Sequence, residues 1–261
     1  MLDTLEQVVA EAKERIATAD RISLFLDFDG TLVPIQADPA LPRLDVTMAK
    51  TLQSLSVRDR LVTTIISGRA IEDLYSRVQL NGLIYAGNHG LEIFGRNLRF
   101  IEPAAAARQK QLAQLCEELR HQLQPFDGVL VEFKGLTASV HYRKAAESAL
   151  PAVEAITLAA VAREGGLFHL NQGRKVFEIL PRTGWHKGAA VRWINGQLGE
   201  GRILSIYLGD DTTDEDAFSV LPDAITIKVG ALPVTCARFR LPDPTAVHDF
   251  LLWLSIQTPL T

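Results

Sequence analysis

Short apolar runs alternate with helical stretches at both ends of this sequence, and this alternation limits the possible fold more than any other feature. Residues 22–26, 61–66 and 203–208 are apolar or β-branched almost throughout. Such runs are typical of strands that are buried on both faces, as in a parallel sheet. A helical stretch follows the second run at residues 70–78, and another precedes the third at residues 186–197. The alternation predicts an α/β fold with a doubly wound, Rossmann-like parallel sheet.

The pattern changes in the middle of the chain. Residues 104–124 and 145–163 each predict one helix, and a predicted hairpin follows each of them. Helix, hairpin, helix and hairpin in this order are typical of a compact α+β module with an antiparallel sheet. We therefore expect a core formed by residues 1–103 and 182–261, interrupted by an inserted α+β domain over residues 104–181.

The composition is that of an ordinary globular protein of 261 residues. Its formal net charge of −4 indicates no polyanion-binding surface, so we expect no nucleic-acid partner. Cys116 and Cys236 lie far apart and lack metal-site spacing, which argues against a disulfide. Residues 3–18 predict an amphipathic helix rather than a signal peptide, and no apolar run is long enough to cross a bilayer. We expect a soluble, cytoplasmic monomer without a membrane partner.

An acidic segment, Asp27-Phe28-Asp29-Gly30-Thr31, follows the first apolar run directly. Open α/β sheets bind their ligands at the carboxyl ends of their strands, which is where this segment would lie. Thr31 adds a hydroxyl and a backbone N–H to the two carboxylates. An Asp-Gly pair is also an ordinary turn signal, so the segment alone leaves both interpretations open.

Three further strand–helix junctions carry groups suited to a phosphate or a metal. Ser67-Gly68-Arg69 follows the second run, Lys187 opens a helix, and the acidic residues 209–216 follow the third run. Each has a plainer interpretation: a helix cap with a surface arginine, a solvated lysine, and a helix N-terminus stabilised by its dipole. Four such junctions in one chain argue against coincidence.

Together these groups predict a magnesium-dependent phosphoryl-transfer site. Mg²⁺ prefers carboxylate, water and phosphate oxygens, and Asp27 and Asp210 can provide such ligands from strand ends. Lys187, Ser67 and backbone amides would neutralise the transferring phosphoryl group. A remaining aspartate can act as nucleophile, and Asp29 can exchange the proton with the leaving group and then with water. The segment RTGWHKG lacks the spacing of a Walker loop.

These motifs resemble those of a known family. DFDGT, Ser67-Gly68-Arg69, Lys187 and GDDTTD are similar to the four motifs of the haloacid dehalogenase superfamily of phosphatases, and the inserted module resembles its C2-type cap. The match is closer still to the trehalose-6-phosphate phosphatases. The segments similar to that family are LDFDGTLVPI, ISGR, GNHGLEI, VEFKGLTASVHYR, GRKVFEILP, GWHKGAA and YLGDDTTDEDAF.

The resemblance implies roles for the core residues. Asp27 would be the nucleophile and Asp29 the general acid and base. Asp27, the backbone carbonyl of Asp29 and Asp210 would hold Mg²⁺, with Asp214 or Asp211 in support. The residues implied for binding the phosphoryl end of the substrate are Thr31, Ser67, Gly68 and Lys187, with Arg69, Asn88 and His89 as further candidates.

The resemblance also implies a sugar site in the insert. Glu132, Lys134 and Glu178 would hold the distal glucose, and Arg143 is a further candidate. Glutamate and lysine supply the acceptors and donors that sugar hydroxyls require. The alternative is that Glu132 and Lys134 form a cross-strand surface pair and that Glu178 is a solvated strand residue.

The implied activity is the hydrolysis of trehalose 6-phosphate to trehalose and phosphate through an aspartyl-phosphate, as in trehalose biosynthesis, with a phosphorylated disaccharide as partner. Another sugar phosphate, such as sucrose phosphate or mannosyl-phosphoglycerate, would use the same core motifs. Two further hypotheses are a non-catalytic phospho-sugar sensor and a phosphotransferase with a sugar acceptor.

Overall fold

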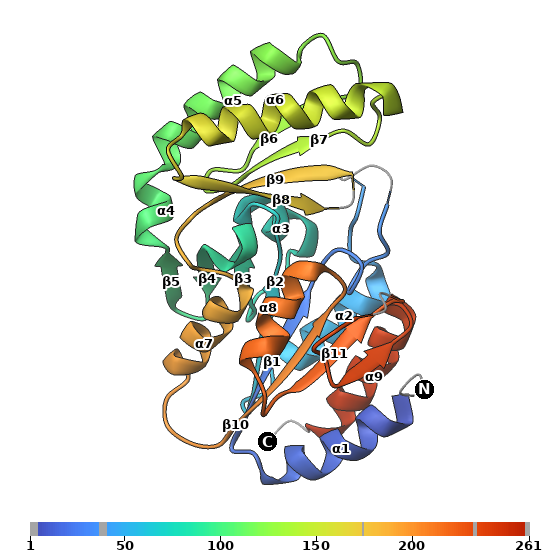
Figure 1. Cartoon of the computed structure of the whole chain (residues 1–261). Helices are drawn as coiled ribbons and strands as arrows, with labels where there is room; N and C mark the ends of the chain where they lie inside the picture. The colour runs from blue at the N-terminus through green and yellow to red at the C-terminus, as the bar shows by residue number, and fades with distance from the viewer. Residues whose placement is uncertain (1–4, 37–40, 174, 232–233, 259–261) are drawn as a thin grey trace. The chain divides into compact units, whose positions relative to one another are not determined.

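The computed structural model describes residues 5–36, 41–173, 175–231 and 234–258, and the chain divides into two compact units (Figure 1). One unit combines Met1–Phe100 with His186–Thr261, and the other is Ile101–Trp185. Residues 3 and 4 of the predicted first helix, and 37–40 of the loop after the acidic segment, lie outside the described residues.

The first unit is built on an eight-stranded sheet in the order β12-β11-β10-β1-β2-β3-β4-β5. The pairs from β12 to β3 are all parallel, and β3 pairs with β4 antiparallel. The strands are β1 (Arg21–Asp27), β2 (Leu61–Ile66), β3 (Ile84–Gly87), β4 (Glu92–Gly95), β5 (Leu98–Ile101), β10 (Ile203–Gly209), β11 (Ile225–Val229) and β12 (Phe239–Leu241). The predicted doubly wound parallel sheet is confirmed.

Helices cover this sheet, and the main hydrophobic cluster lies under α1, α2 and α9. The helices of this unit are α1 (Leu5–Thr18), α2 (Val46–Ser56), α3 (Ile71–Val78), α7 (Lys187–Gln197), α8 (Thr212–Val220) and α9 (Pro244–Gln257), with the 3₁₀ turn η1 (Asn88–Gly90). Side chains alternate along β1, so Leu24 and Leu26 join this cluster while Phe25 and Asp27 face the other side. There Phe25 stacks on Tyr207 of β10. Among the described residues, no helix is both long and apolar enough to span a membrane.

The second unit has its own antiparallel sheet and its own core. The strand order is β6-β7-β9-β8, and two helices pack against each other and against this sheet. Its elements are α4 (Pro103–Ala107), α5 (Gln109–Leu123), β6 (Leu130–Phe133), β7 (Ala138–His141), η2 (Glu147–Ala149), α6 (Leu150–Arg163), β8 (Phe168–Gly173) and β9 (Val176–Pro181).

Two predicted helices differ from the structure, and one strand was not predicted. The single helix predicted over 104–124 is wrong, because the helix is interrupted at Arg108. The Arg108 guanidinium donates to the carbonyl oxygens of Leu167 (3.2 Å) and Arg182 (2.9 Å). The helix predicted over 145–163 begins as a 3₁₀ turn and becomes α-helical only at Leu150. Strand β12 was not predicted, because three residues are too few to show a periodic pattern.

Candidate active site

Strand register brings three sequence-distant segments to one edge of the sheet. Asp27 is the last residue of β1 and pairs with Ile66, the residue before Ser67. On its other side β1 pairs with β10, and Asp210 directly follows that strand. The carboxyl ends of β1, β2 and β10 therefore present Asp27, Ser67 and Asp210 side by side, as the sequence predicts for a parallel sheet.

The turn after β1 is shaped by Gly30. Its φ of +86° lies in the left-handed region, and its N–H donates to the Val33 carbonyl at 2.7 Å. A Cβ built at this position would lie 2.2 Å from Oδ2 of Asp210. The two acidic loops are therefore interlocked, because the Asp210 carboxylate occupies the space that any side chain at position 30 would need.

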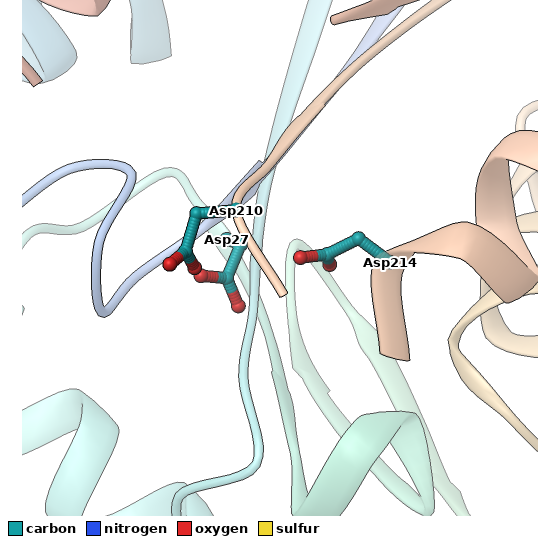
Figure 2. Close-up of side chains that lie close together, drawn as sticks. All are labelled: Asp27, Asp210 and Asp214. Atoms are coloured by element: carbon teal, nitrogen blue, oxygen red, sulfur yellow. The ribbon is translucent and has the colours of Figure 1, made fainter. Parts of the chain in front are cut away.

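Three buried carboxylates converge at this edge. Asp27, Asp210 and Asp214 offer oxygens that all lie within 4.8 Å of one another. Figure 2 shows Asp27 and Asp210 beside each other, with Asp214 reaching toward them from the start of α8. Lys187, buried at the first position of α7, donates to Asp27 Oδ1 at 2.8 Å and to Asp214 Oδ1 at 2.7 Å. The solvated-lysine interpretation is therefore wrong.

The donors around Asp214 separate its role from those of its neighbours. Its Oδ1 accepts from Lys187 and from the Tyr207 hydroxyl at 2.8 Å, and its Oδ2 accepts from the Asp211 N–H at 2.9 Å. Both oxygens are thus engaged by donors within the protein. The Asp211 side chain caps α8 by accepting from the Thr212 N–H at 2.7 Å, and its carboxylate is not among the three that converge. For Asp211, the helix N-terminus interpretation describes the structure.

Asp27, Asp210, Asp214 and Lys187 form a buried charge centre in which carboxylates outnumber the ammonium. Burial raises the pKa of Asp27 well above its usual value, and it outweighs the lowering effect of Lys187, while Asp214 and Asp210 raise this pKa further. Burial lowers the pKa of Lys187, but the carboxylates of Asp214 and Asp27 outweigh burial and raise it well above its usual value, so the ammonium stays charged. With all three carboxylates ionised, these four side chains carry a formal charge of −2.

Asp29 is held apart from this cluster by Arg69. The guanidinium forms two hydrogen bonds with the Asp29 carboxylate, Nε to Oδ2 at 2.6 Å and Nη2 to Oδ1 at 2.7 Å. Arg69 also donates to Asp73 at 2.9 Å and lies over the Phe28 ring. The predicted surface arginine is therefore a largely buried partner of the predicted acid and base. Nearby in the chain, the Thr31 hydroxyl is fully buried and has no hydrogen-bond partner among the described residues.

The loops after β2 and β3 are tied together. The His89 N–H donates to the Ser67 carbonyl at 2.8 Å, and the Asn88 N–H donates to the Arg69 carbonyl at 2.7 Å. The His89 ring fills the position where a Cβ on Gly68 would lie, 2.6 Å from Cε1. Asn88 and His89 both have left-handed backbones, with φ of 48° and 59°. Such local strain is concentrated at functional sites.

In the second unit, the predicted sugar-binding residues share one face of the sheet. Register aligns Glu132, Ser139, Glu178 and Asn171 in a single row across the four strands. Lys134 Nζ lies 4.0 Å from Glu178 Oε1, and these side chains are only 9% and 16% exposed.

Lys134 is largely buried, so the surface interpretation does not describe it. Glu132 contacts His141, whose Nε2 lies 2.7 Å from the Glu132 Oε2. Arg143 is exposed in the turn after β7.

Sequence reasoning missed two residues of the site. Tyr207 lies in an apolar run that predicts a strand, so its hydroxyl gave no separate signal. Glu92 accepts from Asn88 Nδ2 at 2.6 Å and from the Ile71 N–H at 3.0 Å, and it connects the GNHG turn to the start of α3. Burial raises the pKa of Glu92 above its usual value. The sequence signal that could have identified Glu92 was its position four residues after Asn88.

Comparison with known proteins gives consistent matches. The family model for trehalose-phosphatase matches residues 25–241. A trehalose-phosphate phosphatase of Mycobacterium tuberculosis (strain ATCC 25618 / H37Rv) is 38% identical over 237 residues, which are 87% of this chain and 60% of that protein. The chain therefore spans about three fifths of that relative.

Two further matches cover more of the compared chain. A probable trehalose-phosphate phosphatase I of Arabidopsis thaliana is 34% identical over 267 residues, covering 96% of this chain and 70% of that protein. A solved structure described as a trehalose-6-phosphate phosphatase related protein superposes with a TM-score of 0.79 at 26% identity, covering 90% of this chain and 97% of that chain.

Proposed function

Because the chain belongs to the trehalose-phosphatase family, we propose that it is a phosphatase that hydrolyses trehalose 6-phosphate to trehalose and inorganic phosphate. The single observation that carries the proposal is the buried group of Asp27, Asp210 and Asp214 around Lys187 at the carboxyl edge of the sheet. We further propose that it acts as a cytoplasmic monomer, in keeping with its composition.

The residues at this edge fit a magnesium ion. The formal charge of −2 in the fully ionised form favours a divalent cation, and carboxylate oxygens are the ligands that Mg²⁺ prefers. Asp27 and Asp210 would hold the ion together with the Asp29 carbonyl, because the oxygens of Asp214 are already engaged by three donors. When bound, Mg²⁺ would neutralise charge on the phosphoryl group and position it.

The chain's own residues suit the two halves of a phosphoryl transfer. A carboxylate oxygen of Asp27 attacks phosphorus, the bond to the sugar oxygen breaks, and Asp29 gives its proton to that oxygen. Water then attacks the aspartyl-phosphate, Asp29 accepts a proton from it, and phosphate leaves Asp27. Lys187 stays charged beside the nucleophile and stabilises the phosphoryl oxygens. Because Asp29 is paired with Arg69, its proton transfer requires this ion pair to open in the substrate complex.

The remaining site residues would bind the substrate. The buried Thr31 hydroxyl, Ser67 and the backbone at Gly68 are suited to phosphoryl oxygens, with Asn88 and His89 beside them.

The inserted unit would act as a cap that selects the sugar. The face that carries Glu132, Lys134 and Glu178 offers acceptors and donors in one plane, which suits the hydroxyls of a distal glucose. Arg143 is a further candidate there. The division of the chain into a phosphatase core and a specificity cap is part of this proposal.

Phosphate release from a panel of sugar phosphates, with and without Mg²⁺, tests the proposal. We expect the highest kcat/KM for trehalose 6-phosphate, loss of activity in EDTA and recovery with added Mg²⁺. Higher kcat/KM for sucrose phosphate or mannosyl-phosphoglycerate would move the assignment to another sugar. Binding of trehalose 6-phosphate without phosphate release would indicate a sensor instead.

A further inference from the structure

A second buried lysine lies beside the acidic loop. Lys228 is the fourth residue of β11 and is fully buried, and its backbone pairs with Gly209, the residue before Asp210. Its Nζ donates to the Asp211 carbonyl at 2.9 Å. Lys228 therefore holds the backbone of the loop whose side chains include Asp210 and Asp214.

The charge of Lys228 is matched by a carboxylate on α8. Glu215 Oε1 lies 3.2 Å from Lys228 Nζ. Glu215 Oε2 accepts from the Cys236 N–H at 2.7 Å and from the Thr235 hydroxyl at 3.2 Å. The pair thus connects three segments: the end of β11, the first turn of α8 and the chain before β12.

Stability alone does not account for this arrangement. Removing two charges from water opposes their attraction, and a buried ion pair often contributes no net stability over well-packed apolar residues. A fully buried ammonium fixed on a backbone carbonyl does restrict geometry. The carbonyl belongs to Asp211, which follows Asp210 and caps the helix that carries Asp214.

We propose that Lys228 and Glu215 are positioning residues that hold the loop from Asp210 to Asp214 in the conformation that binds the divalent cation. They act through the loop backbone and the first turn of α8 rather than by contact with substrate. The inference rests on the proposed metal site. Partners behind the primary ligands of a metal commonly change its affinity by 10- to 100-fold.

Titration calorimetry with Mg²⁺ tests the proposal, because the heat of binding does not depend on turnover. Lys228→Met removes the charge and keeps a long side chain, and we expect its Kd for Mg²⁺ to rise by about 10-fold. Glu215→Gln keeps the shape and an acceptor for Cys236, and we expect a smaller rise. Lys228→Arg keeps the positive charge, and we expect a Kd closer to that of the wild type.

Arg60→Met is the matched control, since Arg60 lies just before β2 at the opposite end of the strands and donates to the carbonyl oxygens of Ile16 and Ala19. We expect it to lower the unfolding temperature without changing the Kd. If Lys228→Met does not fold, Glu215→Gln and the double variant, which leaves neither charge unpaired, provide the measurement.

A Kd within twofold of the wild type in the folded variants overturns the proposal, even if their unfolding temperatures fall. Wild-type protein that binds Mg²⁺ but releases no phosphate from trehalose 6-phosphate would refute the proposed function, and the titration would still decide the role of the pair. Wild-type protein that binds no Mg²⁺ overturns this inference together with the metal site.

Discussion

Removal of one hydroxyl, by Tyr207→Phe, tests the description of the buried charge centre. The hydroxyl donates to Asp214 Oδ1 at 2.8 Å, and both side chains are fully buried. The ring stacks on Phe25 and meets Phe218 edge-on, and phenylalanine keeps both contacts. The substitution therefore removes one hydrogen bond to a carboxylate and little else.

The expected effect follows from the charge of the acceptor. A hydrogen bond to a charged group contributes about 1.5–3 kcal/mol to the free energy of unfolding. For a protein of this size, 1 kcal/mol corresponds to roughly 2–4 °C in Tm, so we expect Tm to fall by roughly 3–12 °C. Asp214 also holds Lys187, and a loss of about 1.4 kcal/mol in the positioning of the lysine would slow phosphate release about 10-fold.

Thermal unfolding without added metal and phosphate release at saturating Mg²⁺ measure the two effects. Tyr85→Phe is the control, because the Tyr85 hydroxyl bonds the backbone of Leu80 and belongs to no predicted site. We expect the control to lose stability and keep its rate. An unchanged rate in Tyr207→Phe, or equal slowing in both variants, would refute the role given to Tyr207.

Three further predictions concern the nucleophile, the insert and the cysteines. Asp27→Asn should lower phosphate release at least about a thousandfold while Tm stays equal or rises, because burial disfavours the charged carboxylate; activity above that level would exclude Asp27 as nucleophile. Lys134→Ala or Glu178→Ala should lower kcat/KM for trehalose 6-phosphate more than for a small aryl phosphate, and equal losses would contradict a role in sugar recognition. Burial raises the pKa of Cys116 to about 11, so iodoacetamide at pH 8 should label the exposed Cys236 and spare Cys116. Because this pKa is higher in the folded protein, the stability contributed by the neutral Cys116 thiol should be lost only as the pH rises from about 9 through 11. Mass spectrometry of the native protein checks the labelling, and rapid labelling of both thiols would contradict it.

The main features of the fold could be predicted because each depends on neighbours in the sequence. Continuous apolar runs identify strands buried on both faces. The cap of α2 is equally local, because the Asp45 carboxylate accepts from the backbone N–H groups of Thr47 and Met48. The break at Arg108 could not be predicted in this way. It coincides with hydrogen bonds to carbonyl groups more than fifty residues further along the chain.

At the site, too, contacts between residues that are distant in the sequence could not all be predicted. Asp27, Lys187 and Asp210 lie at strand–helix junctions, and the topology alone predicts that they meet. Tyr207 and Lys228 lie inside apolar runs, and their polar atoms meet partners that only the folded chain brings near. A periodic pattern identifies which face a residue lies on, but it does not identify the partner of a buried polar group.

The placement of β1 between β2 and β10 has a consequence for synthesis of the chain. On the ribosome, β1 and β2 emerge early, whereas β10 follows the whole inserted unit. Until β10 is made, one side of β1 exposes unpaired backbone groups that can pair with another nascent chain. The insert has its own core and sheet and can fold during this interval. A fragment that stops before Ile203 would therefore lack Asp210 and Asp214 of the site and would leave one edge of β1 open to aggregation.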